Sequence, residues 1–167
     1  MAQIHTCQIA VAESAIDANG HVNNIEFVRW MQEAAVSHSD AAGCTAATKQ
    51  VGATWVVRSH HIQYLRPAFA GDRITVRTWV ADFRRAFSLR KYEFVRTQEM
   101  NGDAASFLLA ASPFSSTPRG EVLARGETDW VFVDLTTGRP RSIPNSITAL
   151  FEVVSTVDGD GQRQHGK

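Results

Sequence analysis

The sequence is most constrained by a single helix-like segment near its N-terminus, because strand-like segments make up most of the remaining chain. Within that segment, apolar residues and one histidine recur at spacings of three and four, which places a continuous stripe along one side of a helix. The stripe consists of Phe27, Trp30, Met31, Ala34, Ala35 and His38. We expect the helix to begin near Asn24, because Asn23 supplies an N-cap acceptor and Glu26 an acidic group near the positive end of the helix dipole. Gly43 is the predicted stop.

Segments rich in β-branched and aromatic residues predict four long strands after the helix and one short strand before it. The long strands are expected over Thr54–Arg66, Arg73–Ala81, Ala86–Thr97 and Val122–Asp134, and the short one over Ile4–Val11. Turn residues separate them, and the short connections favour antiparallel pairing. One long helix with an antiparallel sheet predicts the α+β class, in which the sheet wraps around the helix.

The length of 167 residues fits one compact domain, which we place at residues 1–157. The polar, Gly-rich residues Asp158–Lys167 are expected to form a disordered tail. Met100–Gly120 is rich in Ala, Ser and Pro, and we interpret it as an extended hairpin loop. Apolar residues between Ile147 and Val154 predict one short terminal helix.

The balance of charged residues argues against nucleic acid and anionic membranes as partners. Seventeen Lys and Arg balance seventeen Asp and Glu, so no long-range field attracts nucleic acid or an anionic membrane. Charged residues or His interrupt every hydrophobic run before it could span a bilayer. Only Cys7 and Cys44 are present and no secretory signal begins the chain, so we expect a reducing cytoplasm. No Cys or His spacing predicts a metal site.

The polar residues most typical of a functional site come immediately before the predicted helix. Asp17, Asn19 and His21 lie within the run from Asp17 to Asn24. Asx residues and Gly are typical of an ordinary turn and N-cap, which is the structural interpretation. The functional interpretation is that a carboxylate lies beside the free N–H groups of a helix start, where an oxyanion can bind.

The run D-A-N-G-H-V-N-N-I-E-F-V-R-W, which begins at Asp17, resembles the signature of the thioesterases related to 4-hydroxybenzoyl-CoA thioesterase. Further similarity lies in Q-Y-L-R-P-A-F-A-G-D at Gln63–Asp72 and in W-V-F-V-D at Trp130–Asp134. The resemblance extends from Ile4 to Phe151. It implies the hotdog fold, an antiparallel β-sheet around one long central helix, and a hydrolase acting on acyl-CoA. Coenzyme A is then part of the substrate, and no cofactor is implied.

The resemblance also implies roles for individual residues. Asp17 takes the place of the catalytic carboxylate, described as nucleophile or as general base in different members of the family. Asn24 falls where a main-chain N–H polarises the thioester carbonyl. Arg84 and Arg85 resemble a cluster that holds the nucleotide phosphates of coenzyme A, although its third position is Ala86 here. In this family two subunits share a sheet, so we expect a homodimer or homotetramer, and exposed edge strands give a physical reason for pairing.

Acyl-ACP thioesterases have a closely similar D-x-N-x-H-V-N-N run, which leaves acyl carrier protein open as the carrier of the acyl group. In those enzymes the residues that match Asp17, Asn19 and His21 all contribute to catalysis. Their later Glu, near Y-R-R-E, is absent, because this chain continues from Tyr64 as Y-L-R-P.

Two other hotdog activities remain as alternatives. Enoyl-thioester hydratases have His five residues after Asp in D-x-N-P-x-H, whereas His21 comes four residues after Asp17. A non-catalytic acyl-CoA-binding protein could share the fold, because a fold does not fix a reaction. Acyl preference depends on the depth of the pocket, for which Phe27 and Met31 are the predicted contacts, although their stripe is also typical of a helix core.

Overall fold

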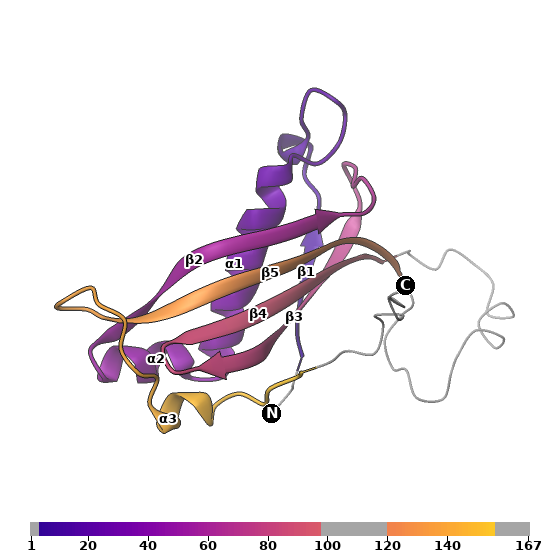
Figure 1. Cartoon of the computed structure of the whole chain (residues 1–167). Helices are drawn as coiled ribbons and strands as arrows, with labels where there is room; N and C mark the ends of the chain where they lie inside the picture. Colours follow the sequence, from indigo (N-terminus) through magenta and orange to yellow (C-terminus); the bar gives the residue numbers. More distant parts are fainter. Residues whose placement is uncertain (1–3, 98–119, 156–167) are drawn as a thin grey trace, which may run out of the picture.

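A computed structural model describes residues 4–97 and 120–155, and it shows a five-stranded antiparallel sheet packed against one long helix (Figure 1). The elements, in order, are β1 (His5–Ala10), the 3-10 turn η1 (Glu13–Ala15), α1 (Asn24–Ala41), α2 (Cys44–Gln50), β2 (Ala53–Tyr64), β3 (Arg73–Arg84), β4 (Phe87–Arg96), β5 (Glu121–Asp134) and α3 (Asn145–Thr148). The strands lie in the order β1-β3-β4-β5-β2, so that β1 and β2 form the two edges. The predicted α+β class, with a sheet around one long helix, is confirmed.

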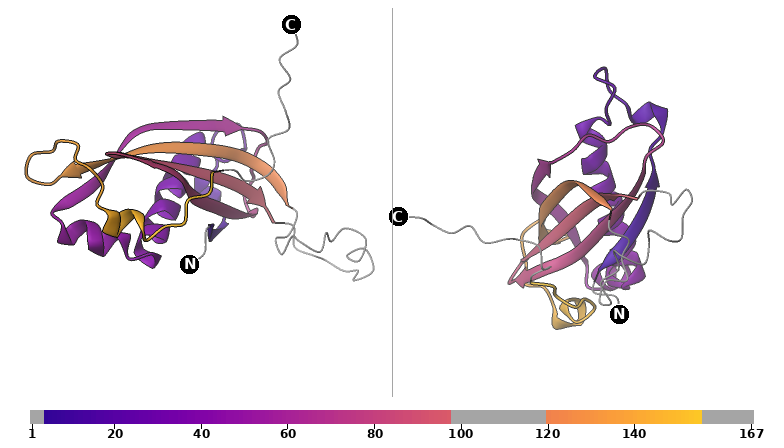
Figure 2. Two further views of the ribbon diagram at one scale, coloured as in Figure 1. Left: turned by 60° about the horizontal axis from the view of Figure 1, so that its bottom comes forward. Right: turned by 90° about the vertical axis from the view of Figure 1, so that its right-hand side faces the viewer.

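The sheet curves over α1, as the turned views of Figure 2 show. The stripe predicted on α1 faces the concave side of the sheet, and all six of its residues are buried. Its partners on β3, β4 and β5 are Ile74, Val76, Tyr92, Phe94, Leu123 and Ala124. This packing forms the main core, because it removes the apolar faces of both layers from water.

The start of α1 matches the prediction. Asn23 is the N-cap, and its side-chain oxygen accepts a hydrogen bond of 3.1 Å from the N–H of Ile25. The helix ends at Ala41, shortly before Gly43, which has a φ of 77° that favours glycine. Gly43 therefore ends the predicted helix and, at the same time, precedes a second one.

That second helix, α2, was not predicted from the sequence. Its segment C-T-A-A-T-K-Q shows little apolar periodicity, but Cys44 and Thr48 are buried. Cys44 packs with Ala53, Phe132 and Ile147 in a small second core at one end of the sheet. Tertiary contacts therefore stabilise a helix that the local sequence does not mark.

The strands differ from the prediction mainly in length. β3 continues to Arg84 instead of ending near Ala81, because a shift of register between Val80 and Asp82 lets it stay paired with β4. α3 is four residues long and is anchored by the fully buried Ile147, so the predicted terminal helix is shorter than its apolar pattern suggests. Of the hairpin loop predicted at Met100–Gly120, residues 100–119 lie outside the described residues, as does the predicted tail at 158–167.

Met31 of α1 packs directly against a residue of the sheet that has no side chain. A Cβ atom added to Gly126 on β5 would lie 2.8 Å from Sδ and 3.0 Å from Cε of Met31. Met31 itself is fully buried. Gly126 therefore sets the distance between α1 and the middle of the sheet.

We expect Gly126→Ala to destabilise the protein by about 1 to 2 kcal/mol, because its methyl group overpacks the core against Met31. In a Gly126→Ala, Met31→Val double variant the shorter side chain removes the clashing atoms, so the combined cost should be smaller than the sum of the two single costs. Urea unfolding of the wild type, both single variants and the double variant measures this. Additive costs would contradict the contact.

Candidate active site

The residues from Asp17 to His21 form a tight loop that projects beyond the first turn of α1 (Figure 1). A bridge between Ile16 and Val22 closes the loop. Inside it, the N–H of Asp17 donates to the carbonyl of His21 at 2.8 Å, and the N–H of Gly20 donates to the carbonyl of Asp17 at 3.1 Å. Gly20 has a φ of 78°, which a residue with a side chain rarely adopts. The loop is therefore fixed by its own backbone.

The Asp17 carboxylate is held in one orientation by this loop. Its Oδ1 accepts hydrogen bonds from the N–H of Asn19 at 2.8 Å and from the N–H of His21 at 3.4 Å. Its Oδ2 makes no hydrogen bond to the described residues. The side chain is half-buried. One oxygen thus fixes the group, and the other is available to a ligand or a water molecule.

The start of α1 presents one backbone N–H that is not already used. The N–H of Val22 donates to Ala68 and that of Asn23 to Ala15, both at 2.8 Å. Those of Ile25 and Glu26 donate to the side chain and carbonyl of Asn23. The N–H of Asn24, an exposed residue, has no partner among the described residues. It is the free donor that a helix start offers to an anion.

Asn19 and His21 contact the carboxylate of Asp17 through their backbone N–H groups only. Both side chains are exposed, and the ring of His21 lies edge-on to that of Phe69, with the centroids 5.4 Å apart. Their predicted catalytic roles therefore stay predictions.

Phe27 and Met31, the predicted contacts of the acyl group, are 2% and 0% exposed. The ring of Phe27 lies edge-on to those of Trp30, Tyr64 and Phe94 at centroid distances of 5.1 to 5.4 Å. Both residues belong to the core of the single chain, as expected if the apolar stripe of α1 is the core face of the helix. Their contact with a substrate stays a prediction.

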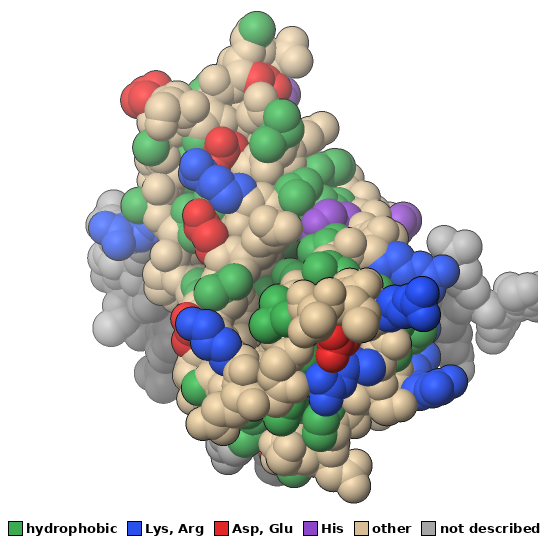
Figure 3. Space-filling model, turned by 90° about the vertical axis from the view of Figure 1, so that its left-hand side faces the viewer, with side chains coloured by type: hydrophobic (Ala, Val, Ile, Leu, Met, Phe, Trp, Pro, Cys, Tyr) green, Lys and Arg blue, Asp and Glu red, His purple; other side chains and the backbone are tan. Residues whose placement is uncertain are grey.

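Arg84 and Arg85 lie at the turn between β3 and β4. The opposite end of β3 is near the Asp17 loop, and the strand is roughly 35 Å long. Arg84 donates to Asp129 at 2.6 Å and lies 3.4 Å from Asp82, and these carboxylates raise its pKa. Arg85 donates to the hydroxyl of Ser142 at 3.4 Å. Figure 3 shows Lys and Arg side chains gathered along one side of the face at this end of the molecule. Within one chain, the arginines and Asp17 are not brought together.

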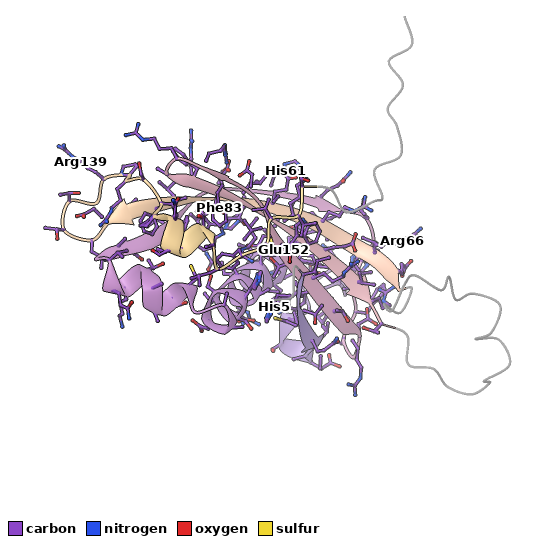
Figure 4. All side chains as sticks on the ribbon, turned by 90° about the horizontal axis from the view of Figure 1, so that it is seen from below. His5, His61, Arg66, Phe83, Arg139 and Glu152 are labelled. Carbon is purple, nitrogen blue, oxygen red and sulfur yellow. The ribbon has the colours of Figure 1, made fainter. Side chains whose placement is uncertain are left out.

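A cavity of about 360 Å³ lies under the sheet, at the end opposite the Asp17 loop. Residues of α1, α2 and four strands line it, including Ala35, Thr48, Trp55, Phe83 and Arg90, together with Phe151 after α3. Figure 4 shows Phe83 beside α3. The lining is mostly apolar, as is usual for pockets that take small organic ligands.

Arg90 is a buried cation within this lining. Its side chain is 4% exposed, and burial lowers its pKa. Nη1 donates to Nδ1 of His38 at 2.8 Å and to the hydroxyl of Thr78 at 3.2 Å. Arg90 was not singled out from the sequence, although it lies two residues before the buried Tyr92 on β4 and therefore on the same inward face. A charged residue at such a position is a recognisable signal.

His38 must be neutral to accept this hydrogen bond, since an arginine only donates. Burial, the charge of Arg90 and the neighbouring His5 together lower the pKa of His38 to about 3. The rings of His5 and His38 stack with centroids 5.1 Å apart. The core therefore holds an imidazole that resists protonation.

The free energy of unfolding should fall as the pH drops from about 6.5 toward 3, because His38 takes up a proton in this range only when the protein unfolds. One such group contributes a slope of up to about 1.4 kcal/mol per pH unit. His38→Gln keeps an acceptor for Arg90 but cannot titrate, so its stability should depend less on pH. Urea unfolding of both proteins from neutral to mildly acidic pH measures the difference. His5 is common to both, and equal slopes would rule out His38 as the source.

The remaining histidines and acidic groups do not form a metal site among the described residues, where no group of three or more His, Cys, Asp or Glu is placed to hold an ion. Nδ1 of His60 lies 2.8 Å from the hydroxyl of Thr128. His61 points to the opposite, outer side of the sheet (Figure 4), so the two do not share a site.

No helix in residues 4–97 or 120–155 has the length and apolar character needed to cross a membrane.

Comparisons with known proteins agree with the fold and the motif. The model of the thioesterase-like superfamily matches residues 11–151. A 1,4-dihydroxy-2-naphthoyl-CoA thioesterase from Synechocystis superposes with a TM-score of 0.67 at 19% identity, covering 88% of this chain and 94% of that one. No curated protein sequence matches.

Two further solved structures are similar. An Asp-to-Asn variant of 4-hydroxybenzoyl-CoA thioesterase, in complex with 4-hydroxybenzoyl-CoA, superposes with a TM-score of 0.70 at 17% identity, covering 90% of this chain and 100% of that one. An acyl-ACP thioesterase from Bacteroides thetaiotaomicron gives 0.71 at 17% identity, covering 99% of this chain and 60% of that one. The hotdog architecture and the resemblance seen in the sequence are confirmed.

Proposed function

We propose that this chain, which belongs to the thioesterase-like superfamily, hydrolyses an acyl thioester of coenzyme A. The observation that carries this proposal is the pairing of two groups at the start of α1. Asp17 has one carboxylate oxygen fixed by backbone N–H groups and one free, and Asn24 offers the unused N–H. A nucleophile or base beside an oxyanion donor is what acyl transfer to water requires.

In the proposed reaction the thioester carbonyl oxygen accepts a hydrogen bond from the N–H of Asn24. Asp17 then either attacks the carbonyl carbon, forming a mixed anhydride that water cleaves, or removes a proton from the attacking water. In both routes the carbon–sulfur bond breaks, and coenzyme A leaves as a thiolate that takes up a proton. Water supplies the hydroxyl of the free acid. Both routes use the same geometry.

The complex of the similar 4-hydroxybenzoyl-CoA thioesterase with its thioester was obtained with an Asp-to-Asn variant. Such a complex is expected if that aspartate takes part in the chemical step. Because Asp17 stands at the family's carboxylate position in the sequence motif, this supports the same role here.

The site should be completed by a second copy of the chain, so we propose a homodimer, alone or paired into a tetramer. β2 is a long edge strand whose outer side carries no partner in the described chain. On α1, Ile25 and Val36 are 70% and 54% exposed, and they share one face of the helix. On β2, Val56 and Tyr64 are also exposed, at 42% and 43%. Edge strands and apolar patches of this kind favour pairing.

Antiparallel pairing of β2 with its own copy would join the two ends of the site. The Tyr64 end of β2 lies at the start of α1, where the Tyr64 hydroxyl donates to the carbonyl of Asn24 at 3.2 Å. The Ala53 end lies at the cavity. A two-fold axis near the middle of β2 therefore places the cavity of one subunit beside the Asp17 loop of the other. It brings Arg84 and Arg85 of the partner copy toward the same side, where they could meet the phosphates of coenzyme A.

An acyl-ACP thioesterase is the second candidate, favoured by the match at Asn19 and His21. Their side chains are exposed and are free to turn toward a bound thioester. The later Glu of those enzymes has no counterpart after Tyr64. Coenzyme A therefore remains the first choice of carrier, in a protein that we place in the cytoplasm.

We expect Asp17→Asn to lower kcat/KM for acyl-CoA hydrolysis by about 100-fold or more, because Asn can neither attack nor accept the proton. Thiol release from a panel of short, long and aromatic acyl-CoA thioesters measures the rate. Asp40→Asn, which removes an exposed carboxylate far along α1, is the matched control and should keep full activity. An active, folded Asp17→Asn variant would refute the proposed role, and an inactive wild type on every CoA ester would favour the carrier-protein substrate.

The role of the Asn24 N–H can be tested without disturbing the helix. Asn24 is the first helical residue and Asn23 has a φ of −59° and a ψ of 135°, a geometry that accepts a following proline. We expect Asn24→Pro, which lacks the N–H, to lose about 100-fold in kcat. Asn24→Ala keeps the N–H and should stay close to wild type. Equal activity of the two folded variants would exclude the N–H as oxyanion donor.

A further inference from the structure

Arg90 is a buried cation that has no negative partner in the described structure. No carboxylate of the described residues lies within ion-pair distance of it. The acidic groups that act on its charge are the Tyr92 phenol and the Cys44 thiol, and no carboxylate is among them. Its remaining contact is the ring of Phe151, 5.7 Å from the guanidinium carbon. A buried charge of this kind is normally paired.

The guanidinium is held so that one edge stays free. Nη1 donates to both His38 and Thr78, which fixes the plane of the group. Nε and Nη2 make no hydrogen bond to the described residues. These two nitrogens form one side of the planar group, and two parallel N–H donors are the geometry that a carboxylate accepts.

The free edge belongs to a residue that lines the cavity of about 360 Å³. Ala35, Trp55, Val80 and Phe83 supply much of the remaining wall, so the cavity suits an apolar chain or ring. Its volume is at the lower end of the range of small-molecule pockets. A ligand that fills it would thus combine an apolar body with one anionic group.

We propose that this cavity binds the acyl part of the thioester, and that Arg90 pairs with a carboxylate at the far end of that acyl group. The substrate class is then the CoA thioesters of dicarboxylic acids, monoesterified at one end. This assignment rests on the proposed function and on the pairing of two copies that brings the cavity to Asp17. A carboxylate suits the site better than a phosphate, because one guanidinium in an apolar wall compensates one charge.

The matched substrates for the test are adipoyl-CoA and hexanoyl-CoA, which have the same number of acyl carbons and differ in the terminal carboxylate. We expect wild-type kcat/KM to be at least about tenfold higher for adipoyl-CoA, because a site built for a polar group rejects the analogue that lacks it. Arg90→Met keeps the length of the side chain without its charge. This variant should lose the preference, so that its kcat/KM values for adipoyl-CoA and hexanoyl-CoA become about equal. Circular dichroism and thermal unfolding establish that it is folded.

A binding measurement separates this proposal from the proposed hydrolysis. By calorimetry, free adipate should bind the Asp17→Asn variant at least as tightly as the wild type, because the negative charge near its second carboxylate is removed. It should bind the Arg90→Met variant at least about tenfold more weakly than the wild type. Arg90→Lys keeps the charge but not the two-donor edge, so we expect an intermediate affinity. Hexanamide, which has the same number of carbons but no charge, serves as the control and should not distinguish the Arg90 variants.

The outcomes distinguish the two proposals. Hydrolysis of both esters at equal rates, without Arg90-dependent binding of adipate, would overturn the carboxylate site and leave the thioesterase proposal standing. Arg90-dependent binding of adipate without hydrolysis of any CoA ester would support the carboxylate site and overturn the proposed hydrolysis of coenzyme A thioesters.

Discussion

The packing of one apolar helix face into the concave side of a curved sheet determines most of this structure. Met31 of α1 lies against Gly126 of β5, and the absence of a side chain there lets the helix approach closely. Since α1 crosses the sheet in one fixed position, its two ends are fixed as well. The first turn presents the Asp17 loop at one end of the molecule, and the last turns form a wall of the cavity at the other. Helix packing thus sets the spatial frame of the candidate site.

This frame leaves a single chain with two separated halves of a site. Asn24 and Val36, a residue of the cavity wall, are roughly 18 Å apart along the helix axis, so a six-carbon acyl group cannot reach both the free N–H and that wall within one copy. The edge position of β2 offers a solution, because a strand that pairs with its own copy reverses direction across the two-fold axis. Catalytic group and acyl pocket would then come from different copies.

The buried polar pair of Arg90 and His38 lowers the stability of the core that surrounds it. A hydrophobic core is most stable without charges, yet burial here keeps His38 neutral and leaves a guanidinium edge without a partner. Such an arrangement weakens the free protein and favours the state in which an anion fills the cavity. Stability and ligand recognition are therefore coupled through the same few contacts between α1 and the sheet.

The sequence by itself determined the stripe on α1, its Asn23 cap, the antiparallel strands and the motif from Asp17 to Asn24, because these depend on local spacing and backbone preference. Only the tertiary structure decided the rest. α2 forms because Cys44 meets Phe132 and Ile147, β3 reaches Arg84 through a register shift, and Arg84 meets Asp129 from a distant strand. Likewise, Arg90, His38 and Thr78 come from three elements far apart in the chain. Contacts across such separations depend on how the layers pack, and local sequence does not specify them.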